Sequence, residues 1–175
     1  MNTKTQPLTL EDRLDIQDLI ARCAWALDTA NVEAFVACFS AQGILIWDVF
    51  EEADRWEGAD ALRAFACLLR DLPSSAGRQH HISNIVIAGP REAAHASSYV
   101  TVVLRQGDGP HPVNVMGYYE DDLIQEAGIW RFRQRVIRDW SGPVLKNFAG
   151  QTGDRVARPR PALLSGLRPS RRREP

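Results

Sequence analysis

The chain has 175 residues and a formal net charge of −1, with 45% hydrophobic and 25% charged residues. These values are typical of one globular domain that is large enough to bury a substantial core. No apolar run approaches the length that crosses a membrane, and residues 1–12 lack the apolar segment of a signal peptide. We therefore expect a cytoplasmic protein with no membrane partner.

The charge is unevenly distributed along the chain. Residues 151–175 contain seven arginines against two acidic residues, a local charge of +5, whereas the first 150 residues carry 14 basic and 20 acidic side chains. A negatively charged body is a poor binder of nucleic acid, so we expect no nucleic-acid partner. We place a single domain at 1–150, followed by a basic C-terminal tail rich in proline and arginine at 151–175. That composition predicts an extended or disordered tail, and we expect residues 152–175 to be dispensable for chemistry unless they cap the pocket.

Several motifs of well-known enzyme classes are absent. The sequence contains no GxGxxG, GxxxxGK[ST], HExxH or GxSxG pattern, which gives no support to nucleotide-binding, zincin or hydrolase-elbow sites. Its three cysteines, Cys23, Cys38 and Cys67, show no CxxC spacing. We expect reduced thiols, no metal site and no cofactor.

The N-terminal half has helical periodicity. Residues 9–28 begin with a capping box formed by Thr9 and Asp12, and apolar residues then recur at spacings of three and four. Further helices are expected at 32–39 and 59–72. A short strand at 44–50 and a polar segment at 51–58 lie between them.

From residue 78 onward the pattern changes to strands. Four strand segments are separated by glycine-rich turns, at 78–89, 94–106, 113–125 and 129–140. Short links between long strands predict an antiparallel meander. Because the helices precede the strands without alternation, the fold class is α+β. We expect a curved antiparallel sheet that the N-terminal helices close into a cone with an internal pocket.

The strongest functional signal is the pair Asp28 and His80. A carboxylate at a helix C-terminus is unfavourable for stability, and such a conflict is expected at functional sites. His80 and His81 are neighbours in a strand, so only one of them can face the pocket. We choose His80, with Asn84 on the same face. An Asp–His pair in an apolar pocket is a competent acid–base unit.

Aromatic residues are expected to line the same pocket. The candidates are Trp25, Trp47, Tyr99 and Tyr119. Alternation along the strand places Tyr119 on the opposite face from Tyr118, and Tyr119 is our first choice for contacting a substrate oxygen. Alternation in the last strand predicts an outward row of arginines, namely Arg131, Arg133 and Arg135.

A family resemblance rests on four segments in order: WALDTANVEAF, QHHISN, GYYEDDL and GIWRFRQRVIRDW. Together they resemble the SnoaL-like branch of the nuclear-transport-factor-2-like superfamily, over about residues 9–141. The resemblance implies an α+β cone whose pocket serves dehydratases, other lyases, isomerases and cyclases. The family also includes non-catalytic subunits of ring-hydroxylating dioxygenases.

Within that family, the scytalone dehydratases are the most useful for assigning roles. Their catalytic aspartate corresponds to Asp28, and the histidine of their TQH segment corresponds to His80. A pocket tyrosine corresponds to Trp47, and a pocket asparagine corresponds to Tyr119. The tyrosine that precedes their aspartate is replaced by Leu27, so the substrate is expected to differ.

These observations predict a cofactor-independent lyase of the dehydratase type, acting on a small, apolar, aromatic or polyketide-like molecule. His80 would take a proton from carbon and Asp28 would orient it. One alternative is an isomerase or cyclase with the same dyad, and another is a non-catalytic binding subunit. We also expect a homodimer formed through an exposed sheet face that carries Val100, Val102 and Val115.

Overall fold

The structure is a computed structural model that describes residues 6–160. Its helices are α1 (Leu10–Asp28), α2 (Val32–Val36) and α3 (Gly58–Asp71). Its strands are β1 (Phe39–Asp48), β2 (Asp54–Glu57), β3 (Gln79–Ala88), β4 (Ala94–Val103), β5 (Val113–Glu126) and β6 (Ile129–Asp139). In this part of the chain no helix is long and apolar enough to span a membrane.

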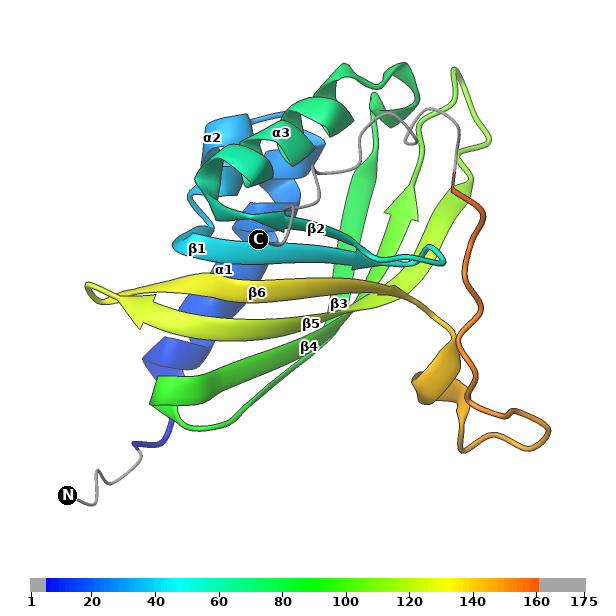
Figure 1. The fold of residues 1–175 in the computed structure, drawn as a ribbon. Coiled ribbons are helices and arrows are strands. Elements are labelled where there is room, and N and C mark those ends of the chain that lie inside the picture. The colour runs from blue at the N-terminus through cyan, green and yellow to red at the C-terminus, as the bar shows by residue number, and fades with distance from the viewer. Residues whose placement is uncertain (1–5, 161–175) are drawn as a thin grey trace, which may run out of the picture.

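The strands form one curved sheet in the order β2-β1-β6-β5-β4-β3, with the helices packed along its concave side (Figure 1). The α+β class is therefore confirmed. Strands β3 to β6 form the expected antiparallel meander. The sheet as a whole is mixed, because β1 pairs with β6 in parallel. Strand β2, which lies in the segment expected to be an irregular polar link, pairs with β1 at the edge.

Helix α1 begins as its sequence predicts. The Asp12 backbone N–H donates to Thr9 Oγ1 (3.1 Å), and the Thr9 backbone N–H donates to Asp12 Oδ2 (3.0 Å). The buried Asp12 carboxylate also accepts a hydrogen bond from Trp130 Nε1 at 3.1 Å. The capping residue thus fixes the start of α1 against β6 as well as satisfying the helix end.

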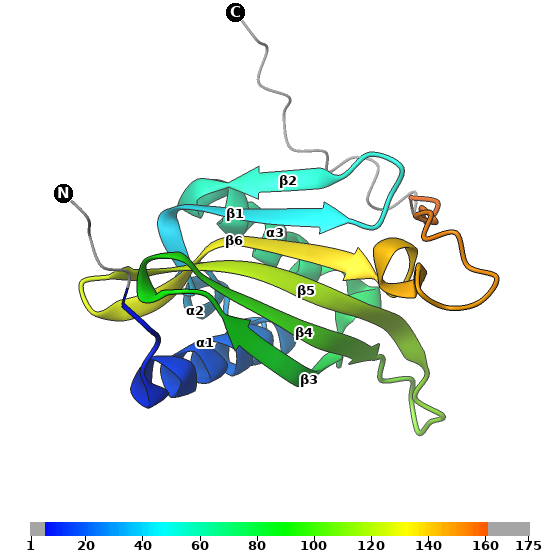
Figure 2. The ribbon, with the colours of Figure 1, turned by 90° about the horizontal axis from the view of Figure 1, so that it is seen from below.

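The core lies between the helices and the concave face of the sheet. Buried apolar side chains of α1 and α3 meet aromatic and aliphatic side chains of the strands, including Ile16, Leu19, Ile20, Leu62, Phe65, Leu45, Leu123 and Phe132. This burial follows the stripe of three and four residue spacings in the two helices. It leaves the other face of the sheet uncovered by helices (Figure 2).

A β-bulge in β6 overturns one expectation about the arginines. Asp122 pairs with Gln134 and Leu123 pairs with Phe132, so Arg133 is an extra residue in the strand. Beyond it, the inward-facing positions change from even to odd numbers. Arg135 is therefore buried and forms a bidentate ion pair with Asp121, with N–O distances of 2.8 and 2.7 Å. The predicted outward row of three arginines is wrong at this position.

The Asp121–Arg135 pair predicts a large and specific effect on stability. The two side chains are 0% and 4% exposed, and removing one partner leaves an uncompensated buried charge. We expect Asp121→Ala to lower the free energy of unfolding by about 3–5 kcal/mol in urea denaturation. The matched control is Asp122→Ala at the neighbouring, more exposed carboxylate. Equal effects of the two substitutions would contradict this account.

The uncovered sheet face also corrects the expected dimer surface. Val100 and Val102 are buried on the concave side, so they cannot form an outer interface. The exposed apolar side chains of β4 and β5 instead include Tyr99, Val113 and Met116. We propose that a second copy of the chain covers this outer face, because the exposed apolar side chains of Tyr99, Val113 and Met116 would leave water on association.

Sedimentation velocity at micromolar concentration tests this proposal. We expect a dimer for the wild type and a shift to monomer for Met116→Glu, which places a charge at the interface. Ile129→Glu, at the exposed β5–β6 turn, should leave the dimer intact. A monomeric wild type would refute the proposal.

Candidate active site

Asp28 and His80 are in direct contact. Asp28 Oδ1 lies 2.5 Å from His80 Nδ1, and Asp28 Oδ2 accepts the His80 backbone N–H at 2.9 Å. The side chains are only 15% and 7% exposed. The last residue of α1 is thereby joined to the start of β3 by both carboxylate oxygens. These contacts offset the unfavourable position of a carboxylate at a helix C-terminus.

His80 stands between Asp28 and a cavity of about 300 Å³. The histidine lines this cavity, as does Leu27, whereas Asp28 borders a second, more open pocket that His80 also lines. With Nδ1 occupied by the carboxylate, Nε2 is the nitrogen left for a substrate. His80 therefore borders the cavity, whereas Asp28 contacts the imidazole and does not line the cavity.

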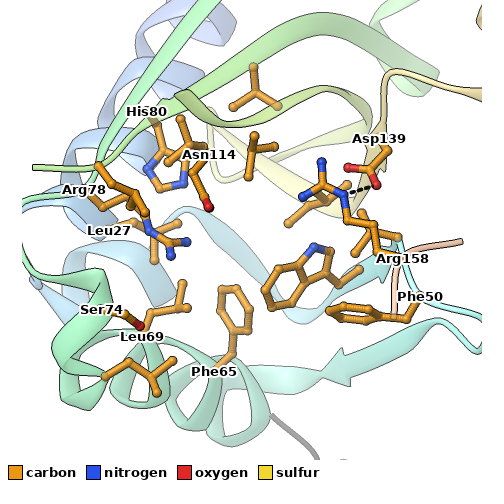
Figure 3. Close-up of a pocket in the computed structure, with 18 of the residues that line it drawn as sticks. Leu27, Phe50, Phe65, Leu69, Ser74, Arg78, His80, Asn114, Asp139 and Arg158 are labelled. Carbon is orange, nitrogen blue, oxygen red and sulfur yellow. Dashed lines mark ion pairs between the residues drawn. The ribbon is translucent and has the colours of Figure 1, made fainter. Parts of the chain in front are cut away.

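The cavity wall is mainly apolar. Helix α3, the β1–β2 connection and strands β4 to β6 supply most of it, with side chains that include Val49, Phe50, Phe65, Leu69, Leu72, Val100, Val102, Leu104, Val115 and Ile137. A volume of this size matches a small organic molecule of one or two rings. Figure 3 shows this wall with the polar side chains distributed around it.

Two of the expected aromatic residues lie in the cavity wall. Trp47 packs its ring edge-on against Phe65, with centroids 6.1 Å apart, and faces the cavity. Tyr119 is buried in the wall formed by β5, and its ring lies under the Arg135 guanidinium at 4.3 Å. Burial raises the pKa of the Tyr119 hydroxyl above its ordinary value, so it is a hydrogen-bond donor at neutral pH.

Three other expected lining residues lie outside the cavity. Trp25 is 72% exposed, because it is on the face of α1 opposite the buried stripe. Tyr99 is 42% exposed and packs on Trp140 at the outer face, since its neighbour Val100 takes the inward position. Asn84 is exposed at a β-bulge, where its φ of 51° marks the break in alternation.

Five polar residues of the cavity are not among the residues selected from the sequence: Ser74, Arg78, Asn114, Asp139 and Arg158. Strand parity could have found Arg78, which is two residues before His80 and shares its face. Asn114 lies at an irregularity in the β4–β5 register, which the alternation pattern does not reveal. Among residues 6–160 no cluster of three or more potential metal ligands is present.

The first part of the C-terminal tail borders the cavity. The Arg158 backbone N–H donates to the Val49 carbonyl at 2.8 Å, and Arg158 Nε pairs with Asp139 at 2.5 Å. Arg160 makes two contacts of 2.6 Å with the buried Asp54. Arg158 and Pro159 form part of the cavity wall. The expectation that the tail is dispensable therefore changes for residues 152–160, while residues 161–175 lie outside the described part.

Comparison with known proteins identifies a family and solved structures that share this architecture. A family model described as the SnoaL-like domain matches residues 8–136. A protein of unknown function with a cystatin-like fold from Nostoc punctiforme is 30% identical, covering 80% of this chain and 100% of that one, with a TM-score of 0.68. A search among curated proteins finds no match.

Two further solved structures share the fold at lower identity. A protein of unknown function from Mycobacterium tuberculosis is 24% identical over 82% of this chain and 80% of that one, with a TM-score of 0.67. A proposed scytalone dehydratase from Novosphingobium aromaticivorans is 23% identical over 74% of this chain and 85% of that one, with a TM-score of 0.63.

The docked tail segment predicts different results for two truncations. Ending the chain after Gly150 removes the cation from the buried Asp54 and opens the cavity beside Asp139. We expect a loss of about 3 kcal/mol or more in the free energy of unfolding, together with weaker ligand binding. Ending it after Arg160 keeps every contact described here and should change neither. Thermal denaturation of both proteins distinguishes the outcomes, and equal stability would show that the docking contributes nothing.

Proposed function

Because the chain belongs to the SnoaL-like family, we propose that it is a lyase of the dehydratase type that acts on a small, largely apolar, aromatic or polyketide-like molecule. The observation that carries the proposal is the His80 imidazole, held by Asp28 in the wall of an apolar cavity of about 300 Å³. The acid–base groups that an elimination requires are side chains of the chain itself.

The dyad supplies the proton transfers of an elimination. Asp28 accepts the Nδ1 proton of His80 and leaves Nε2 as the base. Nε2 takes a proton from a substrate carbon, and the carboxylate stabilises the imidazolium that forms. The C–H electron pair becomes the new C=C bond as the neighbouring C–O bond breaks. The imidazolium then returns its proton to the departing oxygen, so that water leaves and the histidine is neutral again.

Tyr119 is the proposed partner for charge that develops on a substrate oxygen. Its hydroxyl is kept protonated by burial and belongs to the same cavity wall as His80. A donor fixed in a water-poor cavity stabilises an oxyanion more strongly than water does. Trp47 supplies a flat apolar surface for an aromatic substrate.

The space beside the dyad favours a catalytic role over a purely structural one. In a binding subunit, nothing requires an imidazole that is oriented by a carboxylate and borders an unfilled cavity. An isomerase or cyclase would use the same proton abstraction but would return the proton to carbon. The nature of the product therefore distinguishes these reactions.

The first test is a screen of the purified protein against aromatic and polyketide-like alcohols, with mass spectrometry of the products. Loss of 18 mass units, the mass of one water molecule removed in a dehydration, is the expected result. A product of unchanged mass would indicate an isomerase or cyclase. Absence of turnover across the screen, with tight binding of the same compounds, would favour the binding subunit.

The second test compares three variants on the substrate that the screen identifies. We expect His80→Ala to lower the rate by about 10²–10⁴, as removal of a general base does. His81→Ala is the matched control, because His81 is exposed on the other side of β3 and its rate should stay near that of the wild type.

Asp28→Asn should also be severe. An asparagine amide would donate to Nδ1 and place the imidazole proton on Nε2, which removes the base while keeping the shape. Circular dichroism checks that all three variants are folded. A fully active His80→Ala variant would refute the lyase proposal.

A further inference from the structure

Arg78 enters the cavity from the same wall as His80. It immediately precedes β3, and the alternation of that strand places residues 78 and 80 on one face. Figure 3 shows the Arg78 and Arg158 side chains reaching into the cavity from opposite sides. Two cations therefore border a space that is otherwise mainly apolar.

The two arginines differ in how their charge is balanced. Arg158 is paired with Asp139 at 2.5 Å. Among residues 6–160, no side chain forms an ion pair or hydrogen bond with the Arg78 guanidinium, and its buried Nε has no partner. The Asp28 carboxylate lies nearby, but His80 occupies both of its oxygens. Arg78 is thus a partly buried cation that, among residues 6–160, is attracted electrostatically by Asp28 and Tyr119 but forms no direct ion pair.

An unpaired guanidinium in such a place is unfavourable in the empty protein. Burial lowers the pKa of Arg78 from its ordinary value, although the group stays charged at neutral pH. A carboxylate is the group that matches a guanidinium best, because two parallel charge-assisted hydrogen bonds form between them. A ligand that carries a carboxylate would accept a hydrogen bond from Arg78 Nε and would also balance the charge of the guanidinium.

We propose that Arg78 binds a carboxylate of the substrate, so that the substrate is an apolar hydroxy acid rather than a neutral alcohol. This inference rests on the proposed function, because it names the substrate class of the same cavity. The acid group would lie at the β3 end of the cavity, which presents the carbon next to it to His80.

The opposite wall supports this orientation. Asp139 already balances the charge of Arg158 there, and its buried Oδ1 has no hydrogen-bond partner among residues 6–160, so this wall offers no free cation to a carboxylate. The apolar part of the ligand would then lie along Trp47 and Phe65. A single charged contact in an apolar cavity fixes the orientation of the ligand, while the apolar contacts provide most of the buried area.

Binding of a non-reacting acid tests the proposal without turnover. Isothermal titration calorimetry would compare 2-naphthoate with its neutral isostere 2-naphthamide. We expect the wild type to bind the acid at least about tenfold more tightly, as one charge-assisted contact provides. Arg78→Gln should remove this preference, and Arg78→Lys should retain part of it. Arg133→Gln, which removes one exposed charge outside the cavity, should keep it fully.

Thermal stability separates ligand binding from a structural role. Because Arg78 has no partner among the described residues, Arg78→Gln should unfold at the same or a higher temperature than the wild type. A lower unfolding temperature with unchanged preference for the acid would show a structural role and overturn the proposal. Equal binding of acid and amide by the wild type, or no binding of 2-naphthoate at millimolar concentration, would also overturn it.

His80→Ala keeps the two proposals distinguishable. It should still bind 2-naphthoate with the wild-type preference, because the anion contact belongs to Arg78. If His80→Ala also kept full activity on a substrate, the dyad would be refuted while the carboxylate site remained.

Discussion

The contact between Asp28 and His80 connects the two halves of the architecture. One half consists of the N-terminal helices and the other is the strand meander, and Asp28 joins them through two hydrogen bonds to a single residue of β3. A carboxylate ending a helix would be unfavourable in isolation. Its two acceptor oxygens are instead saturated by a backbone N–H and an imidazole. The same contact that fixes α1 against the sheet also sets the tautomer of the histidine, so structure and chemistry depend on one pair.

Charge is distributed unequally around the cavity, and this asymmetry would set the orientation of a charged ligand. The Asp121–Arg135 pair behind Tyr119 is balanced and buried, and it supports the wall from within the sheet. The Asp139–Arg158 pair closes the far side with a segment that follows the sheet in sequence. At the near side, Arg78 has no direct ion-pair partner among residues 6–160 and lies beside the imidazole. Under the proposed function, this cation and the oriented base favour a ligand that has an acidic end and an acidic C–H bond close to it.

The tail shows how a basic composition can serve a local purpose. Its charge contrasts with the acidic body of the chain, and the described part uses that contrast in three arginine–carboxylate pairs, Arg155–Asp48, Arg158–Asp139 and Arg160–Asp54. The Arg155 and Arg158 side chains are 37% and 42% exposed, so their pairs are weak singly, whereas the Arg160–Asp54 pair is largely buried. Here they act together with a backbone hydrogen bond to Val49, which places residues 158 and 159 at the cavity wall.

The sequence by itself determined the elements with strong local signals. The capping box and apolar stripe of α1, the order of helices before strands, and the inward parity of His80 and Tyr119 could all be predicted, because each depends on neighbours in the chain. Asp28 and His80 were selected from a helix-end carboxylate and a strand histidine, and the structure brings them together.

Tertiary structure alone decided the features that depend on register. The bulges at Asn84 and Arg133 shift alternation by one residue, which turns Asn84 outward and buries Arg135. The parallel pairing of β1 with β6 joins segments that are about 90 residues apart in the sequence, and no local pattern predicts such a pairing. The docking of the tail and the isolation of Arg78 likewise depend on which charges meet in space. Composition records those charges, but only the packed chain determines which of them remain unpaired.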